Sequence, residues 1–209
     1  MSETQRIRVL SVDDHPLVRE GIAAMINDQP DMQIVAQGAS GKEAIERFRE
    51  QRPDVVLMDV RLPDMSGIDA MITIRSEFPE ARVIIVTSSE GDAEMRRALE
   101  GGARGYMLKS MPPQDLLEVI RKVHVGKKGI PSEIADRLAN HYGDESLSER
   151  EIEILQQVAE GNRNKDIADK LFISEGTVKV HLKHIMGKLG ANDRTQAITI
   201  AVRRGIIHL

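Results

Sequence analysis

The chain has 209 residues, enough to bury one or two hydrophobic cores, and it contains no cysteine, which excludes disulfide frameworks and thiolate metal sites. No apolar run is long enough to span a bilayer and the first residues lack the apolar stretch of a signal peptide, so we expect a cytoplasmic protein with no membrane association. The net charge of −4 is uneven, at −5 for residues 1–125 and +2 for residues 146–209, which favours different partners for the two parts.

Short β-branched runs alternate with amphipathic stretches over the first 125 residues. Strands that are apolar on both faces and alternate with helices indicate a parallel sheet covered on both sides. The predicted strands are Ile7–Val12, Met32–Ala36, Val55–Met58, Val83–Thr87 and Gly105–Leu108, and the predicted helices are roughly 16–27, 41–51, 67–77, 92–101 and 113–124. Five such units predict a doubly wound α/β domain over residues 1–125, because an eight-unit barrel needs about 250 residues.

The pattern changes after Gly126. Glycines and a proline punctuate residues 126–145, which we interpret as a linker, and Ile134, Leu138 and Tyr142 recur there at the spacing of a short helix. From Leu147 onward only helices are predicted, the first ending near Gly161 and the others at about 165–171, 175–189 and 193–204. Ser148 with Glu151, and Asp193 with Gln196, fit the capping-box pattern at two helix starts. Residues 146–209 are therefore predicted to form a second, all-α domain of four helices.

Polar residues follow four of the five predicted strands. Asp13 and Asp14 end the first strand, Asp59 the third, Thr87 the fourth and Lys109 the fifth. Sites in open α/β sheets form beyond the carboxyl ends of the strands, so these groups are expected to converge. Each alone is explained by an ordinary cap, loop or ion-pair role. Five at the ends of four strands favour a site.

Three neighbouring carboxylates repel one another unless a cation is present, and oxygen-only ligands favour Mg²⁺. Asp59 can then act as a nucleophile toward phosphorus, since aspartyl phosphates are a known covalent form. Lys109 and Thr87 can hold the remaining phosphoryl oxygens by charge and by hydrogen bond.

The segments VLSVDDHPLVREGI, VVLMDVRLPDMSG, VIIVTSS and GARGYMLKS make residues 6–125 resemble the receiver domains of response regulators. The resemblance implies a flavodoxin-like sheet of strand order 2-1-3-4-5. It implies that Asp59 accepts phosphate from a sensor histidine kinase and that Asp13, Asp14, Asp59 and the backbone carbonyl of Arg61 bind Mg²⁺. It also implies a switch formed by Thr87 and Tyr106, whose ring moves inward. Many receivers have proline after the lysine, where this chain has Ser110, so the conformation of that loop is not carried over.

Other motifs in the chain are weaker. His15 lies beside the aspartate pair but more often would be a surface residue at a helix start, so we assign it no role. Gly38-Ala-Ser-Gly-Lys42 has too few residues between its glycines for a P-loop. His181 and His184 lack a third ligand for zinc.

The helix predicted at 175–189 has two contrasting faces. Val178, Leu182, Ile185 and Leu189 form one apolar stripe, and the opposite face carries Gly176, Lys179, Val180, Lys183 and Gly187. A slim basic face can enter the major groove of DNA, where lysines reach guanine or phosphates and valine contacts a thymine methyl. The short helix and tight turn before it predict a helix-turn-helix. The alternative is the solvated face of a small helical bundle.

Residues 147–198 resemble the LuxR-type helix-turn-helix of NarL/FixJ-type regulators through the run LSEREIEILQQVAEGNRNKDIADKLFISEGTVKVHLKHIMGKLGANDRTQAI. The resemblance implies DNA contacts from Lys179, Val180 and Lys183, with His181 and Arg194 as weaker backbone-contact candidates. It also implies that the last helix pairs two copies on DNA through Ile198, Ala201 and Val202, a face that could equally be core.

We expect a two-component response regulator rather than an enzyme, with only Mg²⁺-dependent self-phosphorylation and slow self-dephosphorylation. Phosphorylation would add about −1.5 to −2 charge beside Lys109 and shift the receiver toward a form that dimerises or frees the DNA-binding domain. The expected partners are a sensor kinase, double-stranded DNA, a second copy of the chain and, further, RNA polymerase. Two alternatives remain: a Mg²⁺-dependent phosphohydrolase that uses Asp59, and a constitutive DNA-binding protein whose pocket no longer signals.

Overall fold

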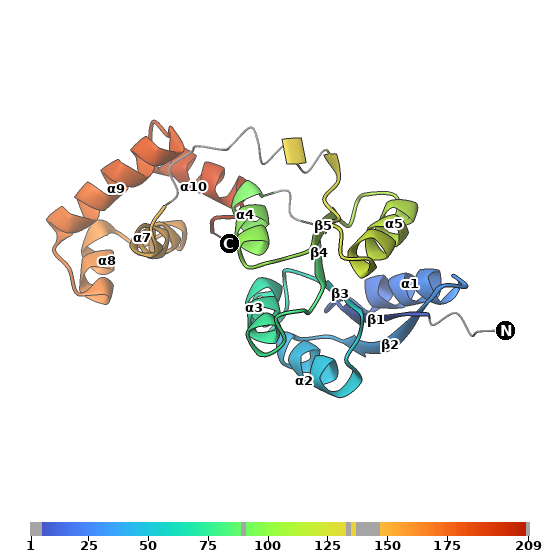
Figure 1. Ribbon diagram of the computed structural model, residues 1–209. Coiled ribbons are helices and arrows are strands. Elements are labelled where there is room, and N and C mark those ends of the chain that lie inside the picture. The colour runs from blue at the N-terminus through green and yellow to red at the C-terminus, as the bar shows by residue number, and fades with distance from the viewer. Residues whose placement is uncertain (1–5, 89–90, 133–134, 137–146, 208–209) are drawn as a thin grey trace. The chain divides into compact units, whose positions relative to one another are not determined.

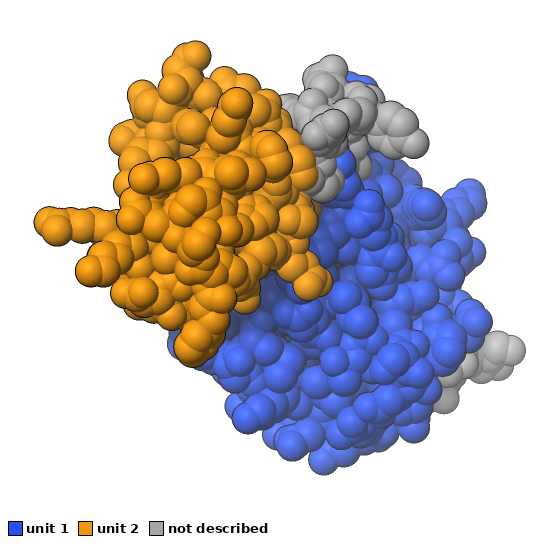
Figure 2. Space-filling model, turned by 90° about the vertical axis from the view of Figure 1, so that its left-hand side faces the viewer, with its two compact units in different colours: residues 1–89, 95–136 blue, residues 90–94, 137–209 orange. Residues whose placement is uncertain are grey.

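The computed structural model describes residues 6–88, 91–132, 135–136 and 147–207. The chain divides into two compact units, residues 1–89 with 95–136 and residues 90–94 with 137–209, which are coloured separately in Figure 2. The short helix expected around Ile134, Leu138 and Tyr142 lies outside the described residues. None of the helices within the described ranges has both the length and the apolarity that crossing a membrane requires.

A five-stranded parallel sheet forms the centre of the first unit. Its strands are β1 (Ile7–Val12), β2 (Met32–Gly38), β3 (Val55–Met58), β4 (Val83–Thr87) and β5 (Gly105–Leu108). They lie in the order β2-β1-β3-β4-β5, and every neighbouring pair is parallel. The doubly wound fold and its strand order are therefore confirmed, and β2 extends two residues beyond its expected end at Ala36.

Five helices belong to the β/α units: α1 (Pro16–Asn27), α2 (Gly41–Gln51), α3 (Gly67–Glu77), α4 (Asp92–Glu100) and α5 (Pro113–His124). In Figure 1, α1 and α5 cover one face of the sheet and α2 and α3 cover the other. Two of the starts have serine caps, since the Ser40 hydroxyl accepts a hydrogen bond from Glu43 N at 3.2 Å and the Ser66 hydroxyl one from Ile68 N at 3.2 Å. Such a cap satisfies a backbone donor that the helix leaves unpaired and stabilises the start by about 1 kcal/mol.

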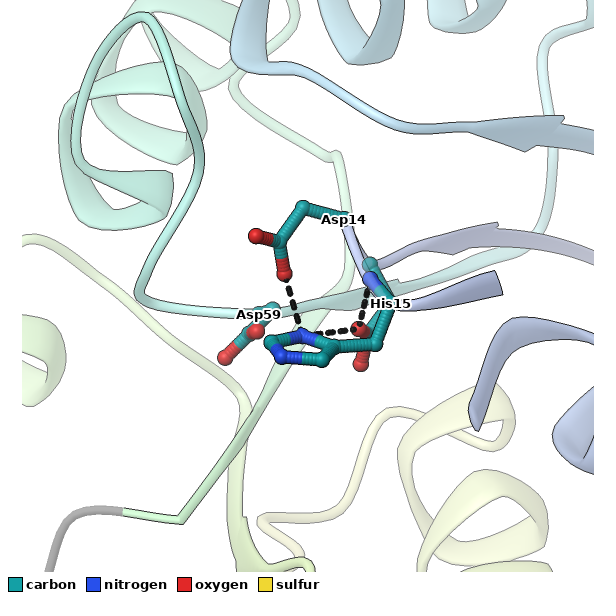
Figure 3. Close-up of side chains that lie close together, drawn as sticks. Asp14, His15 and Asp59 are labelled. Carbon is teal, nitrogen blue, oxygen red and sulfur yellow. Dashed lines mark hydrogen bonds and ion pairs between the residues drawn. The ribbon is translucent and has the colours of Figure 1, made fainter. Parts of the chain in front are cut away.

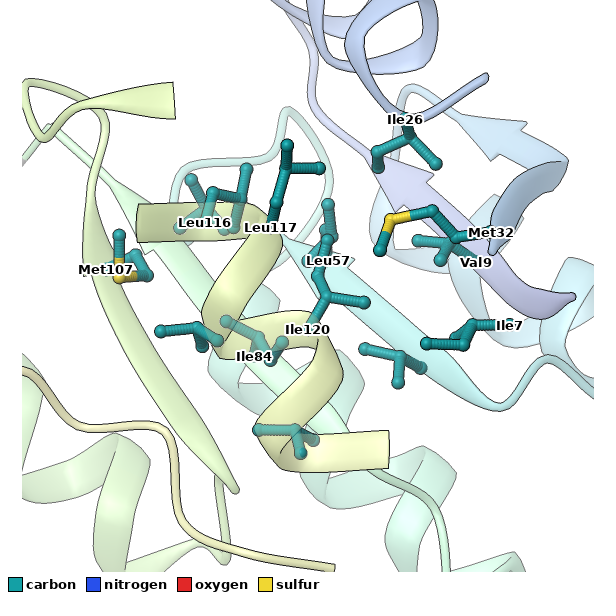
Figure 4. Close-up of a cluster of buried hydrophobic side chains, with 14 residues drawn as sticks. Ile7, Val9, Ile26, Met32, Leu57, Ile84, Met107, Leu116, Leu117 and Ile120 are labelled. Atoms are coloured by element: carbon teal, nitrogen blue, oxygen red, sulfur yellow. The ribbon is translucent and has the colours of Figure 1, made fainter. Parts of the chain in front are cut away.

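An aliphatic core fixes α1 and α5 against the sheet. Val9, Leu57 and Ile84 come from three neighbouring strands and pack with Ile26 of α1 and Ile120 of α5, all of them essentially inaccessible to solvent (Figure 4). Each fully buried aliphatic side chain contributes about 1.5–3 kcal/mol relative to an exposed one. The strand ends, and the polar residues that follow them, are therefore held on a rigid support.

The second unit contains four named helices over residues 147–207, α7 (Glu149–Ala159), α8 (Asn164–Leu171), α9 (Glu175–Leu189) and α10 (Arg194–Arg203). Their core includes Ile154, Ile167, Val178 and Ile185, so the predicted all-α domain is confirmed. The capping box at Ser148 and Glu151 is complete. The second box is half formed. The Asp193 side chain accepts from Gln196 N at 2.8 Å, as a capping box requires. The Gln196 side chain, however, accepts from Asn192 N at 2.6 Å instead of from Asp193 N.

Candidate functional site

The register of the sheet places two aspartates side by side. Val12 of β1 pairs with Met58 of β3, so the next residues along each strand, Asp13 and Asp59, leave the sheet at the same level. The backbone N–H of Asp59 donates to the Val12 carbonyl at 2.9 Å, which extends this alignment past the end of β3. Both aspartates are buried, with relative exposures of 2% and 3%.

The other two strand ends supply a hydroxyl and an ammonium. Thr87 of β4 pairs with Leu108 of β5, and the backbone N–H of Lys109 donates to the Thr87 carbonyl at 2.8 Å. The Thr87 side chain is buried at this end of the sheet. The Lys109 side chain reaches the aspartates, because its Nζ lies 2.6 Å from Asp13 Oδ2 and 2.8 Å from Asp59 Oδ2.

One ammonium therefore serves two buried carboxylates. Burial raises the pKa of Asp59, and the repulsion from Asp13 acts in the same direction, whereas Lys109 and a hydrogen bond from the Arg61 backbone oppose the rise. Burial alone would lower the pKa of Lys109, but its ion pairs with Asp13 and Asp59 raise it. The pocket holds more negative than positive charge, and a further cation would relieve the excess.

Asp14 and His15 complete a group of donor atoms suited to a cation. Asp13, Asp14, His15 and Asp59 each offer one ligand atom, and these atoms lie within 4.8 Å of one another. Figure 3 shows the His15 ring beside Asp14 and Asp59, with its Nδ1 2.6 Å from Asp14 Oδ1. Three carboxylates fit the oxygen preference of Mg²⁺, so the residues present are compatible with the expected ion.

Two further expected residues can be placed. The Arg61 backbone hydrogen-bonds the Asp59 carboxylate, so the peptide whose carbonyl is expected to bind the ion lies next to Asp59. Tyr106 of β5 is fully buried, with a relative exposure of 0%.

Three residues near the pocket were missed by the sequence reasoning. A Cβ at Gly67 would lie 1.8 Å from the Asp59 carbonyl oxygen, so only glycine fits at the start of α3. Arg19 of α1 donates to the Asp13 carbonyl at 2.6 Å. Asp64 accepts from Gly41 N at 2.8 Å and Lys42 N at 3.0 Å, and although burial alone would raise its pKa, these N–H groups lower it. Glycine directly after the Ser66 cap was the only local signal of a close approach.

The second unit contains the expected helix-turn-helix. Helices α8 and α9 are joined by Phe172–Ser174, and the turn begins with Phe172 in a left-handed conformation (φ 55°). Ser174 caps α9 by accepting from Thr177 N at 3.0 Å. The predicted apolar stripe of α9 faces the core, with Val178, Ile185 and Leu189 buried and Leu182 partly buried.

The opposite face of α9 is exposed as expected. Its members are Gly176, Lys179, Val180, Lys183 and Gly187. Lys179 forms an ion pair with Glu175 at 2.8 Å, whereas Val180 is 54% exposed, a high value for an apolar side chain. A basic helix face with one protruding methyl-bearing side chain has the chemistry of a major-groove reader.

The weaker DNA-contact candidates occupy different surroundings. His181 is half-buried, while Arg194 is exposed and donates to the Asn162 carbonyl at 3.2 Å. On α10, Ala201 belongs to the core, and Ile198 and Val202 are half-buried against it. The apolar face of α10 is thus used largely within its own unit.

A doubly wound receiver-type pocket and a helix-turn-helix define a regulator that couples an aspartate-based signal to DNA. The comparisons with known proteins agree. Residues 9–121 match the model of the response regulator receiver domain, and residues 145–201 match that of the bacterial regulatory proteins of the luxR family. The chain belongs to the response regulators that carry a LuxR-type DNA-binding domain, a family of transcriptional regulators rather than of classical enzymes.

Relatives match over nearly their whole length. The chain is 39% identical to VraR, a response regulator protein of Staphylococcus aureus, over 96% of this chain and 99% of that one. It is 39% identical to YxjL, an uncharacterized transcriptional regulatory protein of Bacillus subtilis, over 97% and 98%. A solved structure of RcsB from Salmonella enterica serovar Typhimurium, bound to a promoter in the presence of the phosphomimetic BeF3-, is 27% identical with a TM-score of 0.73, over 94% and 98%. A receiver domain implies a kinase partner, and a LuxR-type domain implies DNA binding.

Proposed function

We propose that Asp59 is the phosphoacceptor of this regulator and that Lys109 and Thr87 hold the incoming phosphoryl group. The observation that supports this most directly is the position of Lys109 Nζ, which contacts carboxylates from two strands at 2.6 and 2.8 Å. An ammonium placed there stabilises negative charge as it develops on phosphoryl oxygens. The Thr87 hydroxyl, buried at the end of β4, offers a hydrogen bond to the same group.

Asp13, Asp14, Asp59 and the backbone carbonyl of Arg61 are the residues that would hold Mg²⁺. Mg²⁺ bound by these residues would neutralise excess carboxylate charge and supply a Lewis acid for the phosphoryl group. Asp13 is already held by Lys109 through Oδ2, and its Oδ1 accepts the His15 backbone N–H at 2.9 Å. Asp14 is more exposed, with a relative side-chain exposure of 36%, and faces the solvent side of the group.

The reaction is a transfer between two nucleophiles. A carboxylate oxygen of Asp59 forms a bond to phosphorus while the bond from phosphorus to the kinase histidine nitrogen breaks, and the electron pair of that bond stays on the nitrogen. Acetyl phosphate can serve as a small donor in the same way, with acetate leaving. Attack of water on the resulting acyl phosphate returns Asp59 to its carboxylate and releases phosphate slowly.

Phosphorylation adds about −1.5 to −2 charge beside Lys109 and Thr87. Thr87 and Tyr106, which are both buried, form the switch. Residues 1–125 act as the receiver, 126–145 as a linker and 146–209 as the DNA-binding domain. Gly129 N donates to the Arg104 carbonyl at 2.8 Å, so the start of that linker runs beside β5.

The DNA-binding domain would insert α9 into the major groove. Lys179 and Lys183 contact phosphates or guanine, Val180 contacts a thymine methyl, and His181 and Arg194 contact the backbone. Two phosphorylated copies pair, in part through α10, and place their α9 helices about one turn of DNA apart. The protein would act in the cytoplasm, where the DNA is, and RNA polymerase is the further partner through which a bound regulator affects transcription.

The test of Asp59 is phosphoryl uptake measured by intact-protein mass spectrometry with acetyl phosphate and Mg²⁺. The native chain and Asp69→Asn should gain one phosphoryl group, since Asp69 lies on α3 outside the pocket and pairs with Arg97 at 2.7 Å. Asp59→Asn should gain none. Equal uptake by Asp59→Asn and the native chain would show that the acceptor is another residue.

A further inference from the structure

His15 occupies a position that its place at a helix start does not explain. It is the residue before α1, yet its side chain makes no capping hydrogen bond to the helix. Its ring contacts pocket carboxylates instead: Nδ1 lies 2.6 Å from Asp14 Oδ1 and 3.6 Å from Asp13 Oδ1. Our sequence-based interpretation of His15 as a surface helix-start residue therefore omits what its imidazole contacts.

The backbone holds the ring in this place. Pro16 follows His15 and restricts it to extended conformations, in agreement with its φ of −83° and ψ of 111°. The His15 backbone N–H also donates to Asp13 Oδ1 at 2.9 Å. Two independent restraints thus fix the Cα of His15 beside the carboxylates, within reach of its exposed imidazole.

The spacing of these donor atoms suits a shared cation. Ligand atoms about 2.0–2.2 Å from one zinc ion in a tetrahedral arrangement lie about 3.4 Å from each other. The two distances from His15 Nδ1 to the carboxylates, 2.6 and 3.6 Å, lie on either side of that value. Lys109 occupies Asp13 Oδ2, while the oxygen nearer to His15 is Oδ1, so the ammonium and a shared cation would not compete for one atom.

We propose that His15 is a fourth side-chain ligand of the pocket and that through it the pocket binds a nitrogen-accepting divalent cation, with Zn²⁺ as the representative, more tightly than Mg²⁺. Mg²⁺ takes oxygen ligands and keeps several of its waters, so it gains little from an imidazole. Zn²⁺ is bound well by a neutral imidazole nitrogen together with carboxylates. Binding through Nδ1 replaces its hydrogen bond to Asp14 and leaves the ring proton on Nε2. This inference rests on the proposed metal role of Asp13, Asp14 and Asp59.

The experiment uses the full-length chain without an affinity tag and measures the Kd of Zn²⁺ and of Mg²⁺ by calorimetry. His15→Ala should weaken Zn²⁺ binding at least about tenfold, since even residues that only support a ligand change metal affinity by about 10–100-fold. The same variant should change the Kd of Mg²⁺ less than about threefold, because that ion takes oxygen ligands. His184→Ala, which removes an exposed imidazole from α9, is the matched control and should leave the Kd of the pocket for Zn²⁺ unchanged.

A second readout reports the bond itself. In a chain labelled with ¹⁵N-histidine, addition of Zn²⁺ should shift the Nδ1 resonance of His15, and Asp14→Asn should reduce that shift. If the native chain binds both cations but His15→Ala changes both Kd values equally, or if the His15 resonance does not move, His15 does not select a nitrogen-accepting cation and the proposed magnesium site stands. If the native chain binds neither cation, both the inference and the proposed metal role fail.

Discussion

The close approach of Gly67 to Asp59 leads to a demanding prediction about the proposed phosphoacceptor pocket. A Cβ at residue 67 would lie 1.8 Å from the Asp59 carbonyl oxygen and 2.9 Å from its carbonyl carbon. Carbon and oxygen atoms that are not bonded stay about 3.2 Å or more apart, so Gly67→Ala requires a displacement of more than about 1 Å. The atoms that must move are backbone atoms, which cannot turn away as a flexible side chain can.

The displacement acts on Asp59, the proposed phosphoryl acceptor. A misplacement of about 1 Å reduces the rate of a positioned reaction by about 100-fold, and overpacking of this kind destabilises by about 1–3 kcal/mol. Gly67 N also donates to the Val60 carbonyl at 2.8 Å, and this bond resists a movement of α3 away from Asp59. We therefore expect Gly67→Ala to slow phosphorylation by about 100-fold and to destabilise the receiver by about 2 kcal/mol.

The assay is the initial rate of phosphoryl uptake from acetyl phosphate, together with urea unfolding of the same samples. Gly21→Ala is the matched control, since Gly21 lies within α1 and a Cβ there meets nothing within 4 Å. This control should keep the native rate and gain roughly 0.5–1 kcal/mol, because alanine is favoured over glycine inside a helix. A native phosphorylation rate in Gly67→Ala, at native stability, would refute the argument that this contact positions Asp59.

Three further predictions concern charges in the two units. Lys109→Met leaves Asp13 and Asp59 buried without their ammonium and should destabilise the receiver by about 3–5 kcal/mol at pH 7. Because the pKa of Asp59 is already raised, this loss of unfolding free energy should shrink as the pH falls and the carboxyl is protonated. The measurement is urea unfolding of the native chain and Lys109→Met at pH 7 and pH 5, and an equal difference at both pH values would contradict the prediction. Glu151→Gln removes an ion pair with Lys188 at 2.8 Å, and it should destabilise the C-terminal unit by about 1.5–3 kcal/mol at pH 7. Burial alone would raise the pKa of Glu151, but Lys188 and Ser148 lower it. The stabilisation by the Glu151 carboxylate is therefore present above the ordinary glutamate pKa and is lost as the pH falls through the lowered value. Amide NMR signals of α7, followed in urea, report the unfolding of this unit, and a stability difference between the native chain and Glu151→Gln that persisted at pH 3 would contradict the prediction. Lys183→Ala should weaken DNA binding evenly across sequences and reduce the slope of log K against log salt by about 1, with Lys122→Ala on α5 as the control.

The strand ends could be predicted from the sequence because they follow from local patterns. The alternation of apolar runs and helices predicts the last residue of β1, β3, β4 and β5, and a parallel sheet then brings Asp13, Asp59 and Lys109 to one edge. No further information about the rest of the chain is needed for that step. The helices of the C-terminal unit were predictable for a similar reason, since the buried stripe of α9 is visible as a spacing of apolar residues.

Other features depend on contacts between residues far apart in the sequence. Asp64 caps α2 from a loop that follows β3, 23 residues from Gly41, and no local pattern pairs them. The close approach of Gly67 depends on how α3 packs over the end of β3. His15 lies at the surface at the start of α1 as expected, but proximity in sequence does not show which way its ring points.

The two units have separate hydrophobic cores, and this separation makes communication between them measurable. Val9, Leu57 and Ile120 belong to one core, and Ile154 and Val178 to the other. Substitutions that share no partners usually add in free energy, so Asp59→Asn and Lys183→Ala should have additive effects on DNA affinity when no phosphoryl donor is present. With donor present, the ratio of the DNA affinities of the native chain and of Asp59→Asn gives the coupling free energy between phosphorylation and DNA binding, and by linkage DNA should favour the phosphorylated state by the same factor. Equal DNA affinities of the two chains with donor present would mean that the pocket and the DNA-binding helix act independently.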